Sequence, residues 1–342
     1  GETLAVAWRD FGNVLTHGCG ISFFDLLSDG RWSDETFWRS VPLMRRLMAE
    51  ARGFKGFQPE VAFVVDENAV QHMKTDTYPL LIHSLSWWRA ELDRLGTPVG
   101  YFLQSDLEML PDSVKVVILA DAFSVSREDR RLINKMFSQG KTVVFNYAPD
   151  IVGPDGIDLN RIKALTGMAV EAKSDDVPMT LVSEFTGEEM VVDPQGWRPR
   201  LVVTEKGVDV VTRYRDTKEV CAAACKAGNG VSVYTAVPRL PVRVLREICR
   251  RAGVHLYRDT PGMTGICGNY LFTHSEGDVR HPFVWPSKAL KAERLVPPSY
   301  FGFDLDEESA WSDQLAPGTT ALYHILPKGV PDQRIPQLKE EF

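Results

Sequence analysis

Between residues 61 and 140 the sequence alternates short apolar segments with amphipathic ones: VAFVV (61–65), PLLIHSLSWWRAELDRL (79–95), VGYFL (99–103), VVIL (116–119) and SREDRRLINKMF (126–137). A further apolar run follows at Thr142–Phe145. Apolar runs of this length, set between amphipathic runs, predict strands alternating with helices. Such an order is typical of an α/β domain built on a parallel sheet.

Polar residues follow several of these predicted strands, where ligands bind in open α/β sheets. They are Asp66, Glu67, Asp121 and Asn146. Acidic pairs can bind metal or transfer protons, but the same residues also cap turns. The sequence has no glycine-rich phosphate loop and no G-x-S-x-G motif. We therefore expect neither cofactor nor metal here, and we assign these residues a structural role.

The seven histidines give little support to a metal site, because none is paired at H-x-H or H-x-x-x-H spacing. His83 falls on the predicted helix 79–95, and we interpret it as a structural residue.

The first fifty residues predict a helix at 3–16, a short buried strand at Ile21–Asp25 and a helix at 34–51. One strand between two helices belongs to a larger sheet or barrel, so we expect its other strands to lie outside this chain. The loop after the strand carries Phe24, Asp25 and Trp32. Aromatic rings pack on the apolar faces of sugars and carboxylates accept hydroxyl protons, so these residues predict part of a sugar site. Ordinary loop packing is the alternative.

Beyond residue 178 the pattern changes to the alternation typical of antiparallel strands. Gly228-Asn229-Gly230 between Val220–Ala227 and Val231–Val237 predicts a hairpin. Short β-like runs between 265 and 330 predict a small antiparallel β-sandwich.

Composition is that of an ordinary soluble protein: 342 residues, 44% hydrophobic, 25% charged, with a net charge of −7. The negative charge argues against nucleic-acid binding, and the lack of an apolar run of about 18 residues argues against a membrane span. The five cysteines are odd in number and irregularly spaced, which predicts free, mostly buried thiols. The sequence does not fix the compartment, although the cytoplasm is slightly favoured.

Residues 8–26, WRDFGNVLTHGCGISFFDL, resemble the last helix and strand of the (β/α)₈ barrel in family 42 glycoside hydrolases of the β-galactosidase type. The α/β segment that follows resembles their trimerisation domain, which has a flavodoxin-like, class I glutamine amidotransferase-like fold. The tail resembles their C-terminal β-sandwich. This resemblance implies three domains: a partial barrel end at 1–52, an amidotransferase-like oligomerisation domain at 58–258 and a β-sandwich at 264–330.

The resemblance also implies what the chain does not do. Amidotransferases carry a cysteine after the strand that matches Thr142–Phe145, where this chain reads Asn146-Tyr147-Ala148. The two glutamates of a retaining galactosidase lie on barrel strands that, by this resemblance, precede the chain, and Glu2 precedes a helix rather than ending a strand. We therefore expect no catalytic residue in the chain, and we expect Asp25, Trp32 and Phe24 to contact sugar.

The predicted role is the oligomerisation and support of a sugar-cleaving barrel. The partners would be the carbohydrate substrate of the intact parent and further copies of the chain, as a trimer or dimer. Two alternatives stay open: a stand-alone amidotransferase-like hydrolase, and a non-catalytic interaction or carbohydrate-binding protein.

Overall fold

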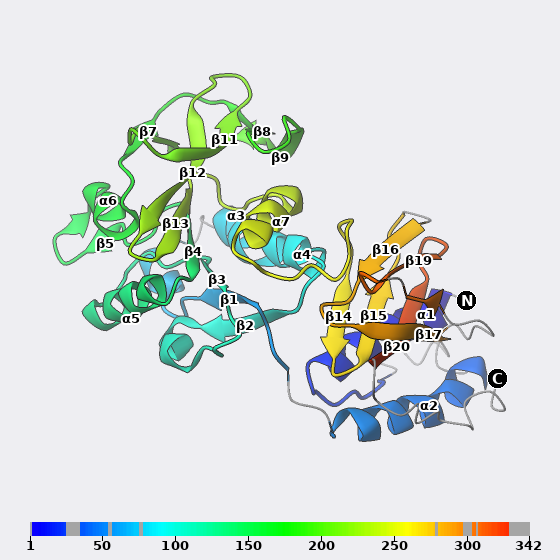
Figure 1. The fold of residues 1–342 in the computed structure, drawn as a ribbon. Helices are drawn as coiled ribbons and strands as arrows, with labels where there is room; N and C mark the ends of the chain where they lie inside the picture. Colours follow the sequence, from blue (N-terminus) through cyan, green and yellow to red (C-terminus); the bar gives the residue numbers. More distant parts are fainter. Residues whose placement is uncertain are drawn as a thin grey trace. The chain divides into compact units, whose positions relative to one another are not determined.

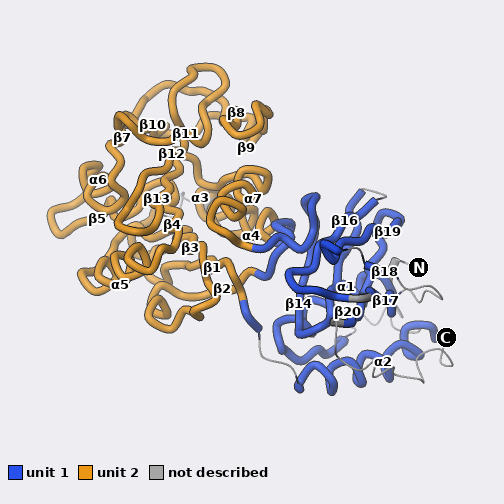
Figure 2. The backbone as a smooth tube through the Cα atoms, in the orientation of Figure 1, with its two compact units in different colours: residues 1–58, 93–98, 255–342 blue, residues 59–92, 99–254 orange. Residues whose placement is uncertain are grey.

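The computed structural model describes residues 2–24, 35–53, 57–74, 78–277, 280–296, 303–305 and 307–327. Two compact units form (Figure 2). Unit 1 holds residues 1–58, 93–98 and 255–342, and unit 2 holds residues 59–92 and 99–254. These units divide the chain differently from the predicted boundaries 1–52, 58–258 and 264–330, which stay predictions.

Unit 2 is built on a nine-stranded sheet in the order β2-β1-β3-β4-β13-β12-β11-β8-β9 (Figure 1). The first five strands run parallel and the last four pair antiparallel. Their bounds are β1 Val61–Val65, β2 Val99–Leu103, β3 Val116–Leu119, β4 Thr142–Asn146, β8 Pro178–Ser183, β9 Glu189–Gly196, β11 Asp209–Tyr214, β12 Val220–Ala227 and β13 Gly230–Thr235. The strands β1, β3 and β4 are almost wholly buried, as their continuous apolar runs predict.

Helices connect the parallel strands. Before β2 the chain forms one helical stretch in three parts: α3 (Tyr78–Leu81), a π-helical segment η3 (Ile82–Trp87) and α4 (Trp88–Asp93). The helix α5 (Arg127–Ser138) begins at a capping box, because the Ser126 hydroxyl accepts from the Asp129 N–H and the Asp129 carboxylate accepts from the Ser126 N–H. The other elements are η1 Ala69–His72, η4 Gln104–Met109, α6 Asn160–Thr166 and α7 Val242–Arg251, and two small sheets, β5–β6 (Val152–Gly153, Gly156–Ile157) and β7–β10 (Val170–Lys173, Arg200–Val203).

Unit 1 joins the two ends of the chain around a five-stranded antiparallel sheet in the order β14-β15-β20-β17-β18. Its strands are Thr264–Cys267, Tyr270–His274, Thr320–Pro327, Ala289–Val296 and Phe303–Asp304. The helices α1 (Glu2–Thr16) and α2 (Glu35–Ala51) share a core with one face, where Phe11 and Leu47 meet Phe272. Leu271 and Tyr323, from the opposite face, pack with Phe283 and Trp311 of the pair β16–β19 (Arg280–Val284, Ala310–Gln314). Successive strand residues face opposite sides, which is why one sheet serves both cores.

The coarse fold prediction is confirmed: the chain is mixed α/β, with a large sheet that is parallel over five strands and separate antiparallel sheets. The hairpin also forms as predicted, with Ala227 opposite Gly230. The flavodoxin-like and barrel-end assignments stay predictions.

The buried strand predicted at Ile21–Asp25 does not form in its described part. Residues 21–24 have no strand partner, and Phe24 is 76% exposed. A strand needs a neighbour for its backbone hydrogen bonds, and the described chain offers none beside this segment. Phe23 instead packs edge-on against Phe37 of α2, with ring centroids 4.7 Å apart.

Candidate functional site

The carboxyl ends of β1 and β3 bring two predicted residues together. Val64 pairs with Leu119, so Asp66 and Asp121 leave neighbouring strands side by side. The Asp66 N–H donates to Oδ1 of Asp121 at 2.8 Å, and Oδ1 of Asp66 accepts from the Asn68 N–H at 2.8 Å. Both carboxylates therefore satisfy backbone groups at turns, which is the structural role predicted from the sequence.

Burial gives this carboxylate pair unusual electrostatics. Asp121 is 1% exposed, and burial, together with the charges of Asp66 and Glu67, raises its pKa to about 7. Burial also raises the pKa of Asp66, whereas a hydrogen bond with Ser105 lowers that of Glu67. A carboxyl that titrates near neutrality has the pKa of a general acid. Among the described residues, no group of three or more His, Cys, Asp or Glu is arranged to hold a metal ion.

The turn after β4 is the one at which the predicted resemblance to amidotransferases would place a nucleophile. Tyr147 has a φ of +52°, an uncommon conformation for a bulky residue that marks a sharp turn. Its phenol donates to the Pro199 carbonyl at 2.7 Å, and its carbonyl accepts from the Tyr234 hydroxyl at 2.6 Å. Burial raises the pKa of the Tyr147 phenol far above its usual value, so it stays protonated and is a poor nucleophile.

Asn146, directly before this turn, is buried and also serves the backbone. Its side-chain amide donates to the carbonyls of Ala120 at 2.6 Å and Pro238 at 3.1 Å. The turn is thus tied to two neighbouring segments and exposes no nucleophile.

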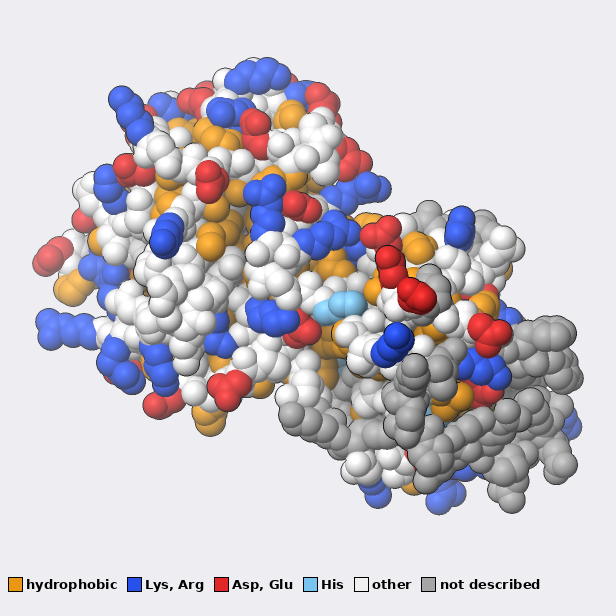
Figure 3. All heavy atoms as spheres, in the orientation of Figure 1, with side chains coloured by type: hydrophobic (Ala, Val, Ile, Leu, Met, Phe, Trp, Pro, Cys, Tyr) orange, Lys and Arg blue, Asp and Glu red, His pale blue; other side chains and the backbone are white. Residues whose placement is uncertain are grey.

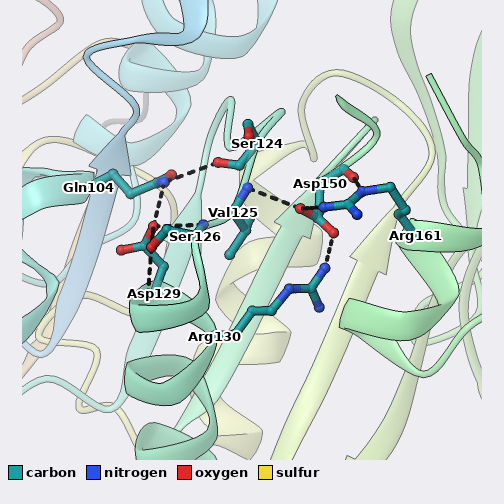
Figure 4. A network of polar contacts seen from close by, with 8 residues as sticks. All are labelled: Gln104, Ser124, Val125, Ser126, Asp129, Arg130, Asp150 and Arg161. Carbon is teal, nitrogen blue, oxygen red and sulfur yellow. Dashed lines mark hydrogen bonds and ion pairs between the residues drawn. The ribbon is translucent and has the colours of Figure 1, made fainter. Parts of the chain in front are cut away.

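A buried carboxylate that sequence reasoning missed completes this end of the sheet (Figure 4). Asp150 is fully buried, has a φ of +55° and accepts from the Val125 N–H at 3.0 Å. It forms ion pairs with Arg130 of α5 and with Arg161 of α6, the latter at 2.8 Å. The network joins the loops after β3 and β4 to both helices, so its role is to fix their positions. Its members are too far apart in the sequence for any local motif to reveal it.

The predicted sugar loop is only partly described. Asp25 and Trp32 lie outside the described residues, so their predicted roles stay predictions. Phe24 is described and its side chain is largely exposed.

All five cysteines have free thiols, as predicted, but only Cys221 and Cys249 are buried, whereas Cys225 and Cys267 are half-buried and Cys19 is exposed. Burial raises the pKa of the Cys221 thiol and that of the Cys249 thiol to about 12, which leaves both protonated and inert near neutral pH. Cys225 borders a cavity of about 260 Å³ near the amino ends of β4 and β13, with Phe137, Leu165 and Gly228 among its lining residues. Burial raises the pKa of this thiol too, so the cavity does not contain an activated nucleophile.

Two further findings concern the surface charge and the length of the helices. On the face seen in Figure 3, acidic and basic side chains of the described residues are interspersed rather than gathered into one basic patch. Within the described ranges no helix is both long enough and apolar enough to span a bilayer.

Neither a protein-family model nor a curated protein matches the chain. Solved structures do match it. A β-galactosidase from Bacillus circulans sp. alkalophilus is 15% identical, with a TM-score of 0.55, over 82% of this chain and 45% of that protein. A β-galactosidase from Rahnella sp. R3 is 13% identical, with a TM-score of 0.59, over 87% and 45%. A GH42 β-galactosidase from G. stearothermophilus, in a catalytic mutant, is 15% identical, with a TM-score of 0.55, over 86% and 44%.

The chain therefore spans less than half the length of these β-galactosidases. At these identities the likeness establishes a shared fold and nothing finer. The resemblance predicted from residues 8–26 and the segments after them is confirmed at that level: the chain has the fold of one part of the GH42 β-galactosidases.

Proposed function

We propose that the chain is the C-terminal part of a glycoside hydrolase resembling the β-galactosidases, and that it supports the sugar-cleaving barrel and holds copies of the protein together. The observation that carries this proposal is the shared fold over more than four-fifths of the chain but less than half of each galactosidase. The amidotransferase-like domain and the partial barrel end are the finer parts of the same proposal.

The side chains described at the strand ends support a non-catalytic role for this part. Tyr147 is buried and hydrogen-bonded where a nucleophile would stand, and the Asp66–Asp121 pair is engaged with backbone N–H groups. No observation favours the amidotransferase-like hydrolase over this reading.

The apolar edge of the large sheet supports the proposed oligomerisation. Among the described residues, strand β2 pairs with β1 alone, and its residues Tyr101 and Leu103 are 42% and 45% exposed. Met109, in the following segment η4, is 70% exposed. Exposed strand edges with large apolar side chains are ready sites of association.

Sedimentation velocity tests the proposed oligomerisation. We expect the chain to sediment as a dimer or trimer at micromolar concentration, and Leu103→Lys with Met109→Lys to dissociate it. The matched control is Ile157→Lys, because Ile157 is 79% exposed but lies in the small sheet β5–β6, away from β2. A monomer at all concentrations would contradict the oligomerisation role, and assembly unchanged by the β2 variant would contradict its placement on this edge.

A further inference from the structure

Aromatic and ionic side chains gather around the π-helical segment η3 in unit 2. The ring of His83 lies edge-on against Trp87, with centroids 4.3 Å apart, and against Trp197, with centroids 5.2 Å apart. The guanidinium of Arg239 lies over the Trp87 ring, 5.5 Å from its centroid. We call His83, Trp87, Asp193, Trp197 and Arg239 the Trp87 cluster. π-Helical segments recur at functional sites, where they change the direction of side chains along a helix.

The exposure of these side chains differs in a way that suits a binding surface. His83 is 3% exposed, whereas Trp87 is 47% exposed and Trp197 is half-buried. The side chain of Asp193 is 18% exposed, more than His83 and less than Trp87. Trp87 therefore presents a large aromatic surface to solvent beside partly exposed polar groups.

The polar side chains of the cluster have partners inside and outside it. Nε2 of His83 lies 2.9 Å from Oδ2 of Asp193. Arg239 pairs with Glu91 at 3.1 Å and donates to the Val192 carbonyl at 2.8 Å. Burial, and to a smaller extent the charge of Arg239, lowers the pKa of His83 against the opposing effect of Asp193, so the imidazole is neutral at pH 7. The Arg239 charge is therefore balanced by Glu91, whereas the Asp193 carboxylate faces a neutral imidazole and can accept hydrogen bonds from hydroxyl groups.

Two polar atoms of the cluster remain without a partner among the described residues. They are Nδ1 of His83 and Nε of Arg239, and both are buried. With its Nε2–H directed at the Asp193 carboxylate, a neutral His83 has an acceptor at Nδ1, whereas Nε of Arg239 is a donor. Buried polar groups are nearly always hydrogen-bonded, and leaving one unpaired costs ~1–3 kcal/mol. A hydroxyl group can serve either atom, because it both donates and accepts.

We propose that the Trp87 cluster binds a neutral pyranose, whose apolar ring face stacks on Trp87 and Trp197 and whose hydroxyls bond to the Asp193 carboxylate, His83 and Arg239. Aromatic platforms beside a few polar groups are the chemistry that recognises uncharged sugars. This site lies in unit 2 beside the turn after β4, since the rings of Trp197 and Tyr147 have centroids 6.5 Å apart. The site does not depend on the proposed oligomerisation. Because the platform is a surface rather than a deep pocket, we expect weak binding, with a Kd of ~1–10 mM.

Titration followed by NMR of the tryptophan indole N–H groups tests this proposal. The probes are methyl β-D-galactopyranoside, lactose and methyl β-D-glucopyranoside, each added to the uniformly ¹⁵N-labelled chain. We expect saturable shifts of the Trp87 and Trp197 indole signals, assigned by their loss in Trp87→Phe and Trp197→Phe. Trp87→Ala should weaken binding by about tenfold or more, which corresponds to about 1.4 kcal/mol. Asp193→Asn should weaken it as well, while keeping the shape of the side chain.

Trp38→Ala is the matched control, because Trp38 of α2 is 54% exposed but belongs to unit 1. We expect this variant to bind the sugars as the parent chain does. Three results would overturn the proposal: no saturable shift with any probe up to about 50 mM, equal weakening by Trp38→Ala and Trp87→Ala, or loss of self-association in Trp87→Ala with no sugar effect. The last result would assign the Trp87 cluster to a protein contact. A negative result in the sedimentation test of the β2 variant would not change how any of these titration results is interpreted.

Discussion

Replacing Asp121 by asparagine should remove a large pH dependence of stability from unit 2. The folded pKa of about 7 and the ordinary value of 3.8 differ by about 3 units, and each unit corresponds to about 1.36 kcal/mol. Between these pH values the folded chain holds a proton that the unfolded chain has released. Because the unfolded state then binds fewer protons, the free energy of unfolding falls as pH rises, by ~4 kcal/mol in all from this group.

The amide introduced by Asp121→Asn keeps a side-chain oxygen that can accept from the Asp66 N–H, as the Asp121 carboxylate does at 2.8 Å. The free energies of unfolding of parent and variant can differ by an amount that does not depend on pH, since an amide replaces a carboxyl. The pH-dependent part is the diagnostic quantity: the stability of the variant relative to the parent should rise by roughly 4 kcal/mol from pH 4 to pH 8. Most of this rise should lie between pH 4 and 7.

Urea-induced unfolding, read by hydrogen-exchange mass spectrometry of peptides from β1 and β3, measures this difference within unit 2. The exposed Asp155 provides the control, and Asp155→Asn should leave the pH profile of the parent nearly unchanged. A relative stability of Asp121→Asn that stays flat across this pH range would refute the reasoning, because Asp121 would then titrate alike in the folded and unfolded chains.

Two further predictions concern groups that hold the fold. Asp150→Asn should lower the free energy of unfolding of unit 2 by ~3 kcal/mol at pH 7, because it removes the buried charge that pairs with Arg130 and Arg161; a loss below about 1 kcal/mol in urea unfolding would contradict this. In the native chain at pH 8, Ellman's reagent should label exposed Cys19 rapidly and should label Cys221 and Cys249 only after unfolding, since burial raises the pKa of both to about 12. Rapid labelling of either buried thiol without unfolding would be the contrary outcome.

The strands of the parallel part of the sheet could be predicted almost to the residue. Val61–Val65, Val99–Leu103 and Val116–Leu119 are apolar runs rich in β-branched residues, bounded by turn residues. Strands β1 and β3 are buried on both faces, so their local composition already carries the signal. Strand β2 has the same apolar composition, although it lies at the edge of the sheet and is partly exposed.

Other strands could not be predicted, because tertiary pairing overrides their local preference. Ala289–Val296 reads ALKAERLV, a good helical composition, yet it forms β17 because it pairs with β20. Glu189–Gly196 contains Pro194, which argues against a strand, but β9 lies at the edge of its sheet, where a missing N–H is tolerated. At residues 21–24 the error is the reverse, since apolar composition alone does not supply a strand with a partner.

The functional candidates divide in the same way. The apolar runs before Asp66 and Asp121 predicted that both lie at strand ends, whereas their side-by-side position depends on the pairing of β1 with β3. The Trp87 cluster could not be predicted, because in the sequence His83 is an isolated histidine on a predicted helix. Its partners come from β9, the connection after it and the segment before α7, and the ion pair of Arg239 with Glu91 spans 148 positions.

The central claim is that this chain supports a sugar-cleaving barrel without performing the chemistry. The most direct measurement is the hydrolysis of p-nitrophenyl β-D-galactopyranoside and related aryl β-glycosides, assayed side by side with this chain and with the product of its complete reading frame. We predict no turnover by the chain. We predict turnover by the complete product, which is lost when either of two strand-end glutamates encoded before Gly1 is changed to glutamine. Turnover by the chain alone that a substitution within residues 1–342 abolishes would contradict the account.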